Sequence, residues 1–291
     1  MGAYLKLKKH VRDKYWDYFE NPYLVRILEF KKRAYVFLKT FNKSGVEKYL
    51  AMERIIYSNL DSSDDKFADY IVGNLYLTPL DKNSSFDNYP FEKYLLRYIK
   101  NTKDKIALDY ACGAGRQILR MAKYFKRVDG ADISLPLTQV CKRRTKDLKN
   151  PSVVYNNNGF DLRDIASDSY DFVYSTVAFQ HIAPYDIRRN LLKEFLRILK
   201  PKAKICLQMV YTEKPRERWK EHVDWLENPF DALSTNGSCD AKITPNSLND
   251  VKKTFEEIGF KNFNYKLEPL PYNLPEELEE DTNFIYLYAE K

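Results

Sequence analysis

Small and acidic residues around Gly113 have the spacing of a ligand-binding turn. An apolar run over residues 106–108 ends on Asp109, and the turn that follows contains Ala111, Gly113 and Gly115 before a helical pattern begins. Glycine adopts backbone angles that other residues avoid, and it lets a ligand approach the main chain. The free amides at the start of the next helix favour negative charge or a hydrogen-bond acceptor. The stretch therefore predicts a strand, a tight ligand-binding turn and a helix.

A second carboxylate follows at the end of the next strand pattern. Asp132 stands nineteen positions after Gly113, the separation at which a βαβ nucleotide fold places an acid against ribose hydroxyls. A nicotinamide dinucleotide and S-adenosylmethionine both carry such a ribose. The dinucleotide fingerprint requires glycine or alanine where this chain has Ile118, and isoleucine is bulky for close packing of helix on strand. The pattern therefore favours S-adenosylmethionine.

These residues resemble the motifs of the class I S-adenosylmethionine-dependent methyltransferases. Asp109 to Gly115 is similar to the family's first motif, with Ala111 where the family usually has its first glycine. The resemblance continues in order through GADIS around Asp132, the triplet NGF at 158–160, YDFVYS at 170–175 and a helix and strand over 185–211. It implies a Rossmann-like α/β fold, with a seven-stranded mainly parallel sheet whose last strand is antiparallel, and helices on both faces.

The resemblance also implies a role for individual residues. Asp132 would bind ribose, Ile133 would lie beside adenine, and Asn158 stands where the family often has an acid that meets the adenine amino group. The donor-binding residues that it implies are Asp109, Ala111, Gly113, Gly115, Asp132, Ile133, Asn158, Gly159, Phe160 and Ser175. His181, just after the fourth strand, is the candidate general base, and a structural hydrogen-bonding role for it stays open. His222 is a weaker candidate.

Strand and helix patterns alternate along the chain, which predicts a mainly parallel sheet. Strands are expected near 105–110, 127–132, 152–156, 170–175 and 203–211, helices near 115–126, 135–149 and 185–199, and two closing strands near 261–267 and 284–289. Thr244 and Pro245 predict the start of a further helix that runs to Ile258. Ligands bind outside the carboxyl ends of parallel strands, so Asp109, Asp132, Asn158 and Ser175 should converge on one crevice.

Charge and polarity suggest how the chain divides. Polar residues between 61 and 88 predict a boundary, with a basic helical extension over 1–88 and the methyltransferase domain over 89–291. Residues 1–60 contain thirteen Lys or Arg and six Asp or Glu, which accounts for the whole net charge of +7. Such a segment attracts RNA, a phosphate-bearing substrate or an anionic membrane surface, or is the solvated face of a helical cap. The aromatic-rich insertion at 212–243 is either a lid over the acceptor or a peripheral element.

The remaining features exclude several classes. No run of 18 or more apolar residues and no signal-peptide core are found, so a soluble cytoplasmic protein is expected. The four cysteines, Cys112, Cys141, Cys206 and Cys239, have no paired spacing, which indicates neither a zinc site nor a disulfide framework. The pattern does not decide the oligomeric state.

The loop after the fourth strand favours a small-molecule acceptor. Residues 175–178 read STVA where relatives that methylate nucleic-acid bases carry an Asn/Asp-Pro-Pro-aromatic motif, so DNA is not expected as a substrate. HIAP at 181–184 resembles relatives that methylate small molecules, sugars included. The preferred hypothesis is O-methylation of a saccharide on a nucleotide or lipid carrier. An RNA methyltransferase and a non-catalytic partner protein with this fold are the alternatives.

Overall fold

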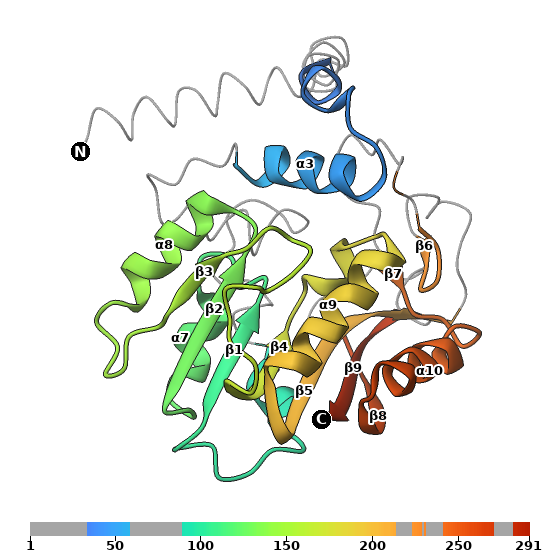
Figure 1. Cartoon of the computed structure of the whole chain (residues 1–291). Helices are drawn as coiled ribbons and strands as arrows, with labels where there is room; N and C mark the ends of the chain where they lie inside the picture. Colours follow the sequence, from blue (N-terminus) through green and yellow to red (C-terminus); the bar gives the residue numbers. More distant parts are fainter. Residues whose placement is uncertain (1–33, 59–88, 214–222, 229, 231–240, 271–281) are drawn as a thin grey trace, which may run out of the picture.

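A single mixed sheet forms the centre of the molecule (Figure 1). The computed structural model describes residues 34–58, 89–213, 223–228, 230, 241–270 and 282–291. The strands of the sheet are β1 (Ile106–Tyr110), β2 (Arg127–Asp132), β3 (Val154–Asn156), β4 (Tyr170–Ser175), β5 (Leu199–Thr212), β8 (Lys261–Glu268) and β9 (Thr282–Glu290). Their order is β3-β2-β1-β4-β5-β9-β8, and β9 runs antiparallel between β5 and β8. The predicted Rossmann-like fold is confirmed.

Helices cover both faces and the carboxyl edge of this sheet (Figure 1). They are α3 (Gly45–Ser58), α6 (Phe91–Leu95), α7 (Arg116–Met121), α8 (Leu135–Thr145), α9 (Tyr185–Ile198) and α10 (Leu248–Ile258), with a 3₁₀ turn η1 (Phe179–His181) after β4. The helices predicted over 115–126 and 135–149 end earlier, at Met121 and Thr145. For α7 the reason is packing, because the chain turns to stack Phe125 on Phe172 of β4 at 5.8 Å between ring centroids.

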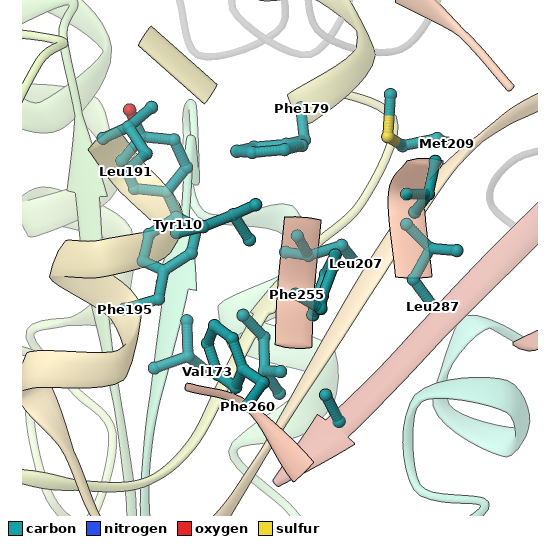
Figure 2. Close-up of a cluster of buried hydrophobic side chains, with 14 of the residues drawn as sticks. Tyr110, Val173, Phe179, Leu191, Phe195, Leu207, Met209, Phe255, Phe260 and Leu287 are labelled. Atoms are coloured by element: carbon teal, nitrogen blue, oxygen red, sulfur yellow. The ribbon is translucent and has the colours of Figure 1, made fainter. Parts of the chain in front are cut away.

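The central strands are buried on both faces, as expected for a parallel sheet between two helical layers. Along β4, Phe172 and Tyr174 enter one apolar cluster while Val173 enters the other. Figure 2 shows the second cluster, in which Val173 lies among side chains that include Phe195 of α9 and Phe255 of α10. The two apolar layers fix the sheet and therefore fix the relative positions of the strand ends.

The helix predicted to begin at Thr244 begins instead at Leu248. The Thr244 amide donates to Ser247 Oγ at 2.9 Å, and the Ser247 amide donates to Thr244 Oγ1 at 3.2 Å. These reciprocal bonds close a turn that contains Pro245. The predicted start is wrong because Thr244 and Ser247 use their hydroxyls to close this turn, and the helix begins only after it.

Only part of the N-terminal extension is described. Residues 34–40 are helical and α3 follows them, in agreement with the helical extension expected from the sequence. Residues 1–33 and the boundary expected at 61–88 lie outside the described residues. Among the residues that are described, no helix is long and apolar enough to cross a bilayer.

Candidate functional site

The turn between β1 and α7 is built on left-handed backbone. Gly113 has φ 51° and Gly115 has φ 85°, and Ala111 takes φ 57° although it carries a Cβ. This conformation costs a non-glycine residue about 1 kcal/mol, which explains why the family usually has glycine where Ala111 stands. A Cβ on Gly115 would lie 2.8 Å from Cys141 Sγ of α8, so this glycine also permits close packing.

The packing of α7 on β2 accommodates the bulky Ile118. Its side chain is fully buried, and a Cβ on Gly130 of β2 would lie 2.8 Å from Ile118 Cδ1 and 2.7 Å from Cys112 Sγ. In a dinucleotide-binding fold, a glycine on the helix allows the helix to pack closely on the strand. In this chain, Gly130 on the strand provides the space instead. The glycine in VDGAD is therefore a further sequence signal of this packing, beyond the motifs that predicted the turn.

Asp132 closes the turn against the start of α8. Its Oδ2 accepts from the Gly113 amide at 2.9 Å and its Oδ1 accepts from the Ser134 amide at 2.8 Å. Bonds from amides to a carboxylate are stronger than neutral hydrogen bonds, so they hold the glycine turn in place. Each carboxylate oxygen can accept a further bond. Asp132 therefore fits a ligand that presents hydroxyl groups at the end of β2.

Asp109 is a second buried carboxyl in the same place. Burial raises the pKa of Asp109 well above its usual value, the charge of Asp132 raises it further, and Arg116 lowers it. Burial also raises the pKa of Asp132, although the amides of Ser134 and Gly113 lower it. A positive ligand group near both carboxyls would favour their ionised forms. The pair therefore fits a cationic ligand.

Several buried polar atoms at this edge lack a hydrogen-bond partner among the described residues. They are both side-chain polar atoms of Gln117, Ser175 Oγ, Gln180 Oε1 and Asn157 Nδ2. Each residue follows the carboxyl end of β1, β3 or β4, or ends that strand. An unpaired buried polar group costs about 1–3 kcal/mol, so a polar ligand that meets these atoms would be stabilised. Of this set, the sequence motifs predicted only Ser175.

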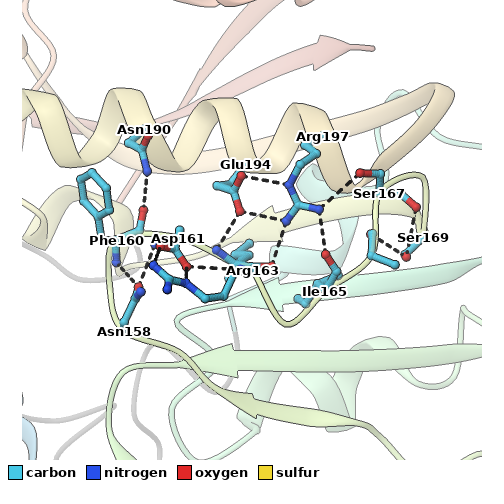
Figure 3. A network of polar contacts seen from close by, with 12 residues as sticks. Asn158, Phe160, Asp161, Arg163, Ile165, Ser167, Ser169, Asn190, Glu194 and Arg197 are labelled. Atoms are coloured by element: carbon cyan, nitrogen blue, oxygen red, sulfur yellow. Dashed lines mark hydrogen bonds and ion pairs between the residues drawn. The ribbon is translucent and has the colours of Figure 1, made fainter.

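A cleft of about 490 Å³ opens beside them and is lined in part by Ile133, Asn158 and Asp161. Asn158 Oδ1 accepts from the amides of Phe160 and Asp161, both at 2.8 Å, so the atom expected to meet the adenine amino group already serves its own loop. Figure 3 shows Arg163 bonded to Asp161, and this guanidinium holds the pKa of Asp161 well below its usual value. The cleft therefore contains a charged acceptor that no sequence motif indicates.

A buried arginine holds the loop that follows η1. The Arg188 guanidinium of α9 donates to the carbonyls of Ile182, Ala183 and Trp225. It also lies 5.0 Å from the centroid of the Trp225 ring. Burial lowers the pKa of Arg188 to about 10, so the side chain stays charged at neutral pH. His181, directly before this loop, is partly exposed at the edge of the site.

Residues 108–207, which run from β1 into β5, match the protein-family model described as "Methyltransferase domain". This part of the chain is therefore a methyltransferase domain, as the resemblance to the class I S-adenosylmethionine-dependent methyltransferases implies. The match covers the glycine turn, Asp132, the cleft and His181, so the site described above lies at the centre of the methyltransferase domain.

The chain is also similar to known proteins in sequence or in fold. Demethylmenaquinone methyltransferase of Staphylococcus saprophyticus is 24% identical over 193 residues, or 61% of this chain and 80% of that protein. The structure of phosphoethanolamine N-methyltransferase 2 of Haemonchus contortus with S-adenosyl-L-methionine has a TM-score of 0.56 and 16% identity, over 82% of this chain and 59% of its own. The [4+2]-cyclase SpnF has a TM-score of 0.53 and 14% identity, over 69% of this chain and 79% of its own. The two structural likenesses show the fold alone.

Helix α3 lies across the carboxyl edge of the methyltransferase sheet (Figure 1). The Tyr49 hydroxyl donates to the His181 carbonyl at 3.0 Å and accepts from the Ala183 amide at 3.2 Å. Arg54 donates to the Asn158 carbonyl at 2.9 Å. Helix α3 therefore joins the loops after β3 and β4, a role that no motif in its sequence indicates.

Glycine at 159 lets α3 come close. A Cβ on Gly159, which has φ 80°, would lie 3.0 Å from Leu50 Cδ2 of α3 and 2.6 Å from Ile133 Cδ1. Gly159 and Ile133, both expected to contact the donor, are thus brought together beneath an apolar side chain of α3. Leu50 of α3 therefore packs against this end of the cleft.

The described part of the insertion packs on α9. Trp225 is fully buried and meets the Tyr185 ring edge to face at 6.3 Å. Beside it, β6 (Val223–Asp224) pairs with β7 (Ala241–Lys242) in a second, two-stranded sheet. This part is an anchored peripheral element. His222 and residues 231–240 lie outside the described residues, so a lid over the acceptor stays a prediction for them.

The backbone just after β4 is strained. Val177 has φ 53°, and its amide donates to Oε1 of the fully buried Gln208 of β5 at 2.6 Å. A β-branched residue in the left-handed region is an outlier that surrounding contacts must maintain. Gln208 therefore fixes the path of the chain between Ser175 and His181.

The raised pKa of Asp109 gives a testable pH dependence. The folded protein should lose stability as the pH rises from the ordinary value of 3.8 through the raised pKa, because the buried carboxyl must then ionise. We expect Asp109→Asn to unfold at a higher temperature than the unaltered protein at neutral pH, without ligand, and at the same temperature below this window. Asp104→Asn, at an exposed position, is the control. Parallel profiles for Asp109→Asn and the unaltered chain would refute the assignment.

Proposed function

We propose that this S-adenosylmethionine-dependent methyltransferase acts on a small-molecule acceptor in the cytoplasm. The proposal depends mainly on one observation. Asp132 accepts from the Gly113 amide at the edge of the sheet where several buried polar atoms find no hydrogen-bond partner in the described part of the chain. The replacement of a base-methylation motif by STVA supports a small molecule over DNA. The names of two relatives, which specify demethylmenaquinone and phosphoethanolamine, agree with small acceptors.

A saccharide hydroxyl is the acceptor that we propose first. HIAP at 181–184 resembles relatives that methylate sugars, and the basic N-terminal segment suits a phosphate-bearing nucleotide or lipid carrier. We place the N-terminal extension at 1–88, so that α3 belongs to it and covers the donor.

The residues present fit S-adenosylmethionine. When bound, it supplies a sulfonium methyl group that is open to in-line attack. Asp132 would accept from the ribose hydroxyls, Ile133 would pack on adenine, and Asp109 would favour the amino group. The glycine turn lets the donor approach the backbone. With α3 over the cleft, the domain aligns the reactants and excludes water, which can contribute several kcal/mol to catalysis.

His181 is the general base of this proposal, since it lies in the loop after β4 and can accept the acceptor's proton. We expect His181→Gln to lower turnover by about 10²-fold and to leave donor affinity within about twofold, because the loop is held through its backbone by Tyr49. Single-turnover rates and calorimetry measure the two quantities. Tyr49→Phe removes only the hydroxyl and is the control for a shifted loop. Unchanged turnover in His181→Gln would reduce the residue to a structural role.

Because the acceptor is not identified, its chemical class can be tested by offering the protein a mixture of cellular compounds. The protein would be incubated with methyl-labelled donor and cell extract, and the label counted in saccharide, lipid and RNA fractions. Label confined to RNA would overturn the proposal in favour of an RNA methyltransferase. Failure to bind the donor in calorimetry would favour a non-catalytic role for the fold.

A further inference from the structure

The helix before α3 presents its apolar side outward. The large exposed side chains of this helix and of the turn that follows it are Tyr35 at 48%, Phe37 at 58%, Leu38 at 66% and Phe41 at 67% exposure. The residues of the same helix that face inward and are buried are Val36 and Thr40. A surface helix normally buries its apolar stripe and turns its polar face to water. The reversal here leaves four large apolar groups within seven residues in contact with solvent.

We propose that this face, residues 35–41, docks on an anionic lipid surface. Helices that lie in a bilayer interface combine aromatic and aliphatic side chains with lysine at their flank. Lys39 lies on the exposed face with its Nζ 5.9 Å from the centroid of the Tyr35 ring. All of the net positive charge of the chain resides in residues 1–60, which adds attraction to anionic headgroups.

The geometry favours lipid over single-stranded nucleic acid. Base stacking requires ring faces that stand open along a basic groove. The rings of Phe37 and Phe41 lie against each other at 6.5 Å between centroids with a 35° tilt, and Leu38, whose side chain stacks on no base, is among the most exposed residues of the face. Apolar side chains that pack on one another are suited to burial together at the boundary between lipid headgroups and acyl chains.

The position of the helix determines which part of the domain would face the lipid surface. The helix leads into α3, which contacts the loops after β3 and β4. Docking would therefore hold the covered end of the donor cleft near the lipid headgroups. The further step, that docking gives the site access to a lipid-linked acceptor, rests on the proposed function. Docking itself does not depend on it.

The test uses the full chain and vesicles of phosphatidylcholine, alone or mixed with phosphatidylglycerol. We expect co-sedimentation with the mixed vesicles that weakens as salt rises, and at least a tenfold loss of binding in Phe41→Glu. Tyr265→Glu, a substitution at an exposed aromatic on β8, is the matched control and should bind as the unaltered chain does. Calorimetric binding of S-adenosylmethionine by Phe41→Glu shows that the variant is folded and that failure of docking is separate from failure of the proposed function.

Four outcomes would overturn the inference. The first is absence of binding to the mixed vesicles, or equal binding to phosphatidylcholine alone. The second is a dimer in light scattering that Phe41→Glu converts to a monomer, because the face would then contact a second copy. The third is a lower unfolding temperature for Phe41→Glu without vesicles, because the face would then be packed within the chain. The fourth is preferential, salt-sensitive retention on RNA.

Discussion

Replacement of Asp132 by alanine should weaken the binding of S-adenosylmethionine by at least about a hundredfold. Hydrogen bonds to a charged group contribute about 1.5–3 kcal/mol each, so the loss of the ribose contacts corresponds to about 3 kcal/mol, or a hundredfold in affinity. The substitution also removes the acceptor of the Gly113 and Ser134 amides. The glycine turn should therefore lose its fixed shape in addition to its ligand contact. Titration calorimetry measures the change.

Asp129→Ala is the matched control for this experiment. Asp129 lies on the same strand, is fully buried, and accepts from the Val153 amide at 2.8 Å and the Tyr170 hydroxyl at 3.0 Å. Its removal should destabilise β2 by a comparable amount. Because Asp129 sits three residues before the carboxyl end of the strand, donor affinity of the folded variant should change little. Equal losses of affinity in the two variants would mean that Asp132 acts only through stability.

The sequence predicted those parts of the site that depend on residues close together in the chain. A strand, a glycine turn and an acid at the end of the next strand are read from local spacing, and the sheet brings Asp109 and Asp132 to one edge as parallel topology requires. The resemblance to the family likewise implied the antiparallel last strand, which is β9 between β5 and β8. These features depend on residue type and order, both of which the sequence displays.

The contacts that the sequence did not predict join residues far apart in the chain. Tyr49 meets His181 across 132 positions, and Arg54 meets Asn158 across 104. Nothing in the residue types of an amphipathic helix specifies such partners. Asn158 illustrates a related limit. Its side-chain oxygen Oδ1 was expected to meet adenine, but in the structure this atom accepts from the amides two and three residues later in the chain. The residue was identified by position, but the use of its atoms is decided by the loop.

Arg188 is the position where we expect the largest loss of stability. Arg188→Met preserves much of the side-chain volume but leaves the carbonyls of Ile182, Ala183 and Trp225 without their donor. Each buried carbonyl that is left without a donor costs about 1–3 kcal/mol, so the loss of all three bonds should cost about 3–5 kcal/mol. The free energy of unfolding in urea should fall by about that amount. Arg188→Lys should lose less, because an ammonium group keeps the charge and can reach some of the carbonyls.

The adjacent residue, Arg189, provides the matched control for this prediction. Arg189 is partly exposed, and its guanidinium lies 3.8 Å from the Glu257 carboxylate in a surface ion pair. Such pairs contribute about 0–1 kcal/mol, so Arg189→Met should unfold close to the unaltered protein. Arg188 also holds the backbone that follows His181, and its loss should therefore slow methyl transfer more than it weakens donor binding. Equal stability of the two methionine variants would show that the buried guanidinium does not hold this loop, and the positioning of His181 would then have to come from Tyr49 and Gln208 alone.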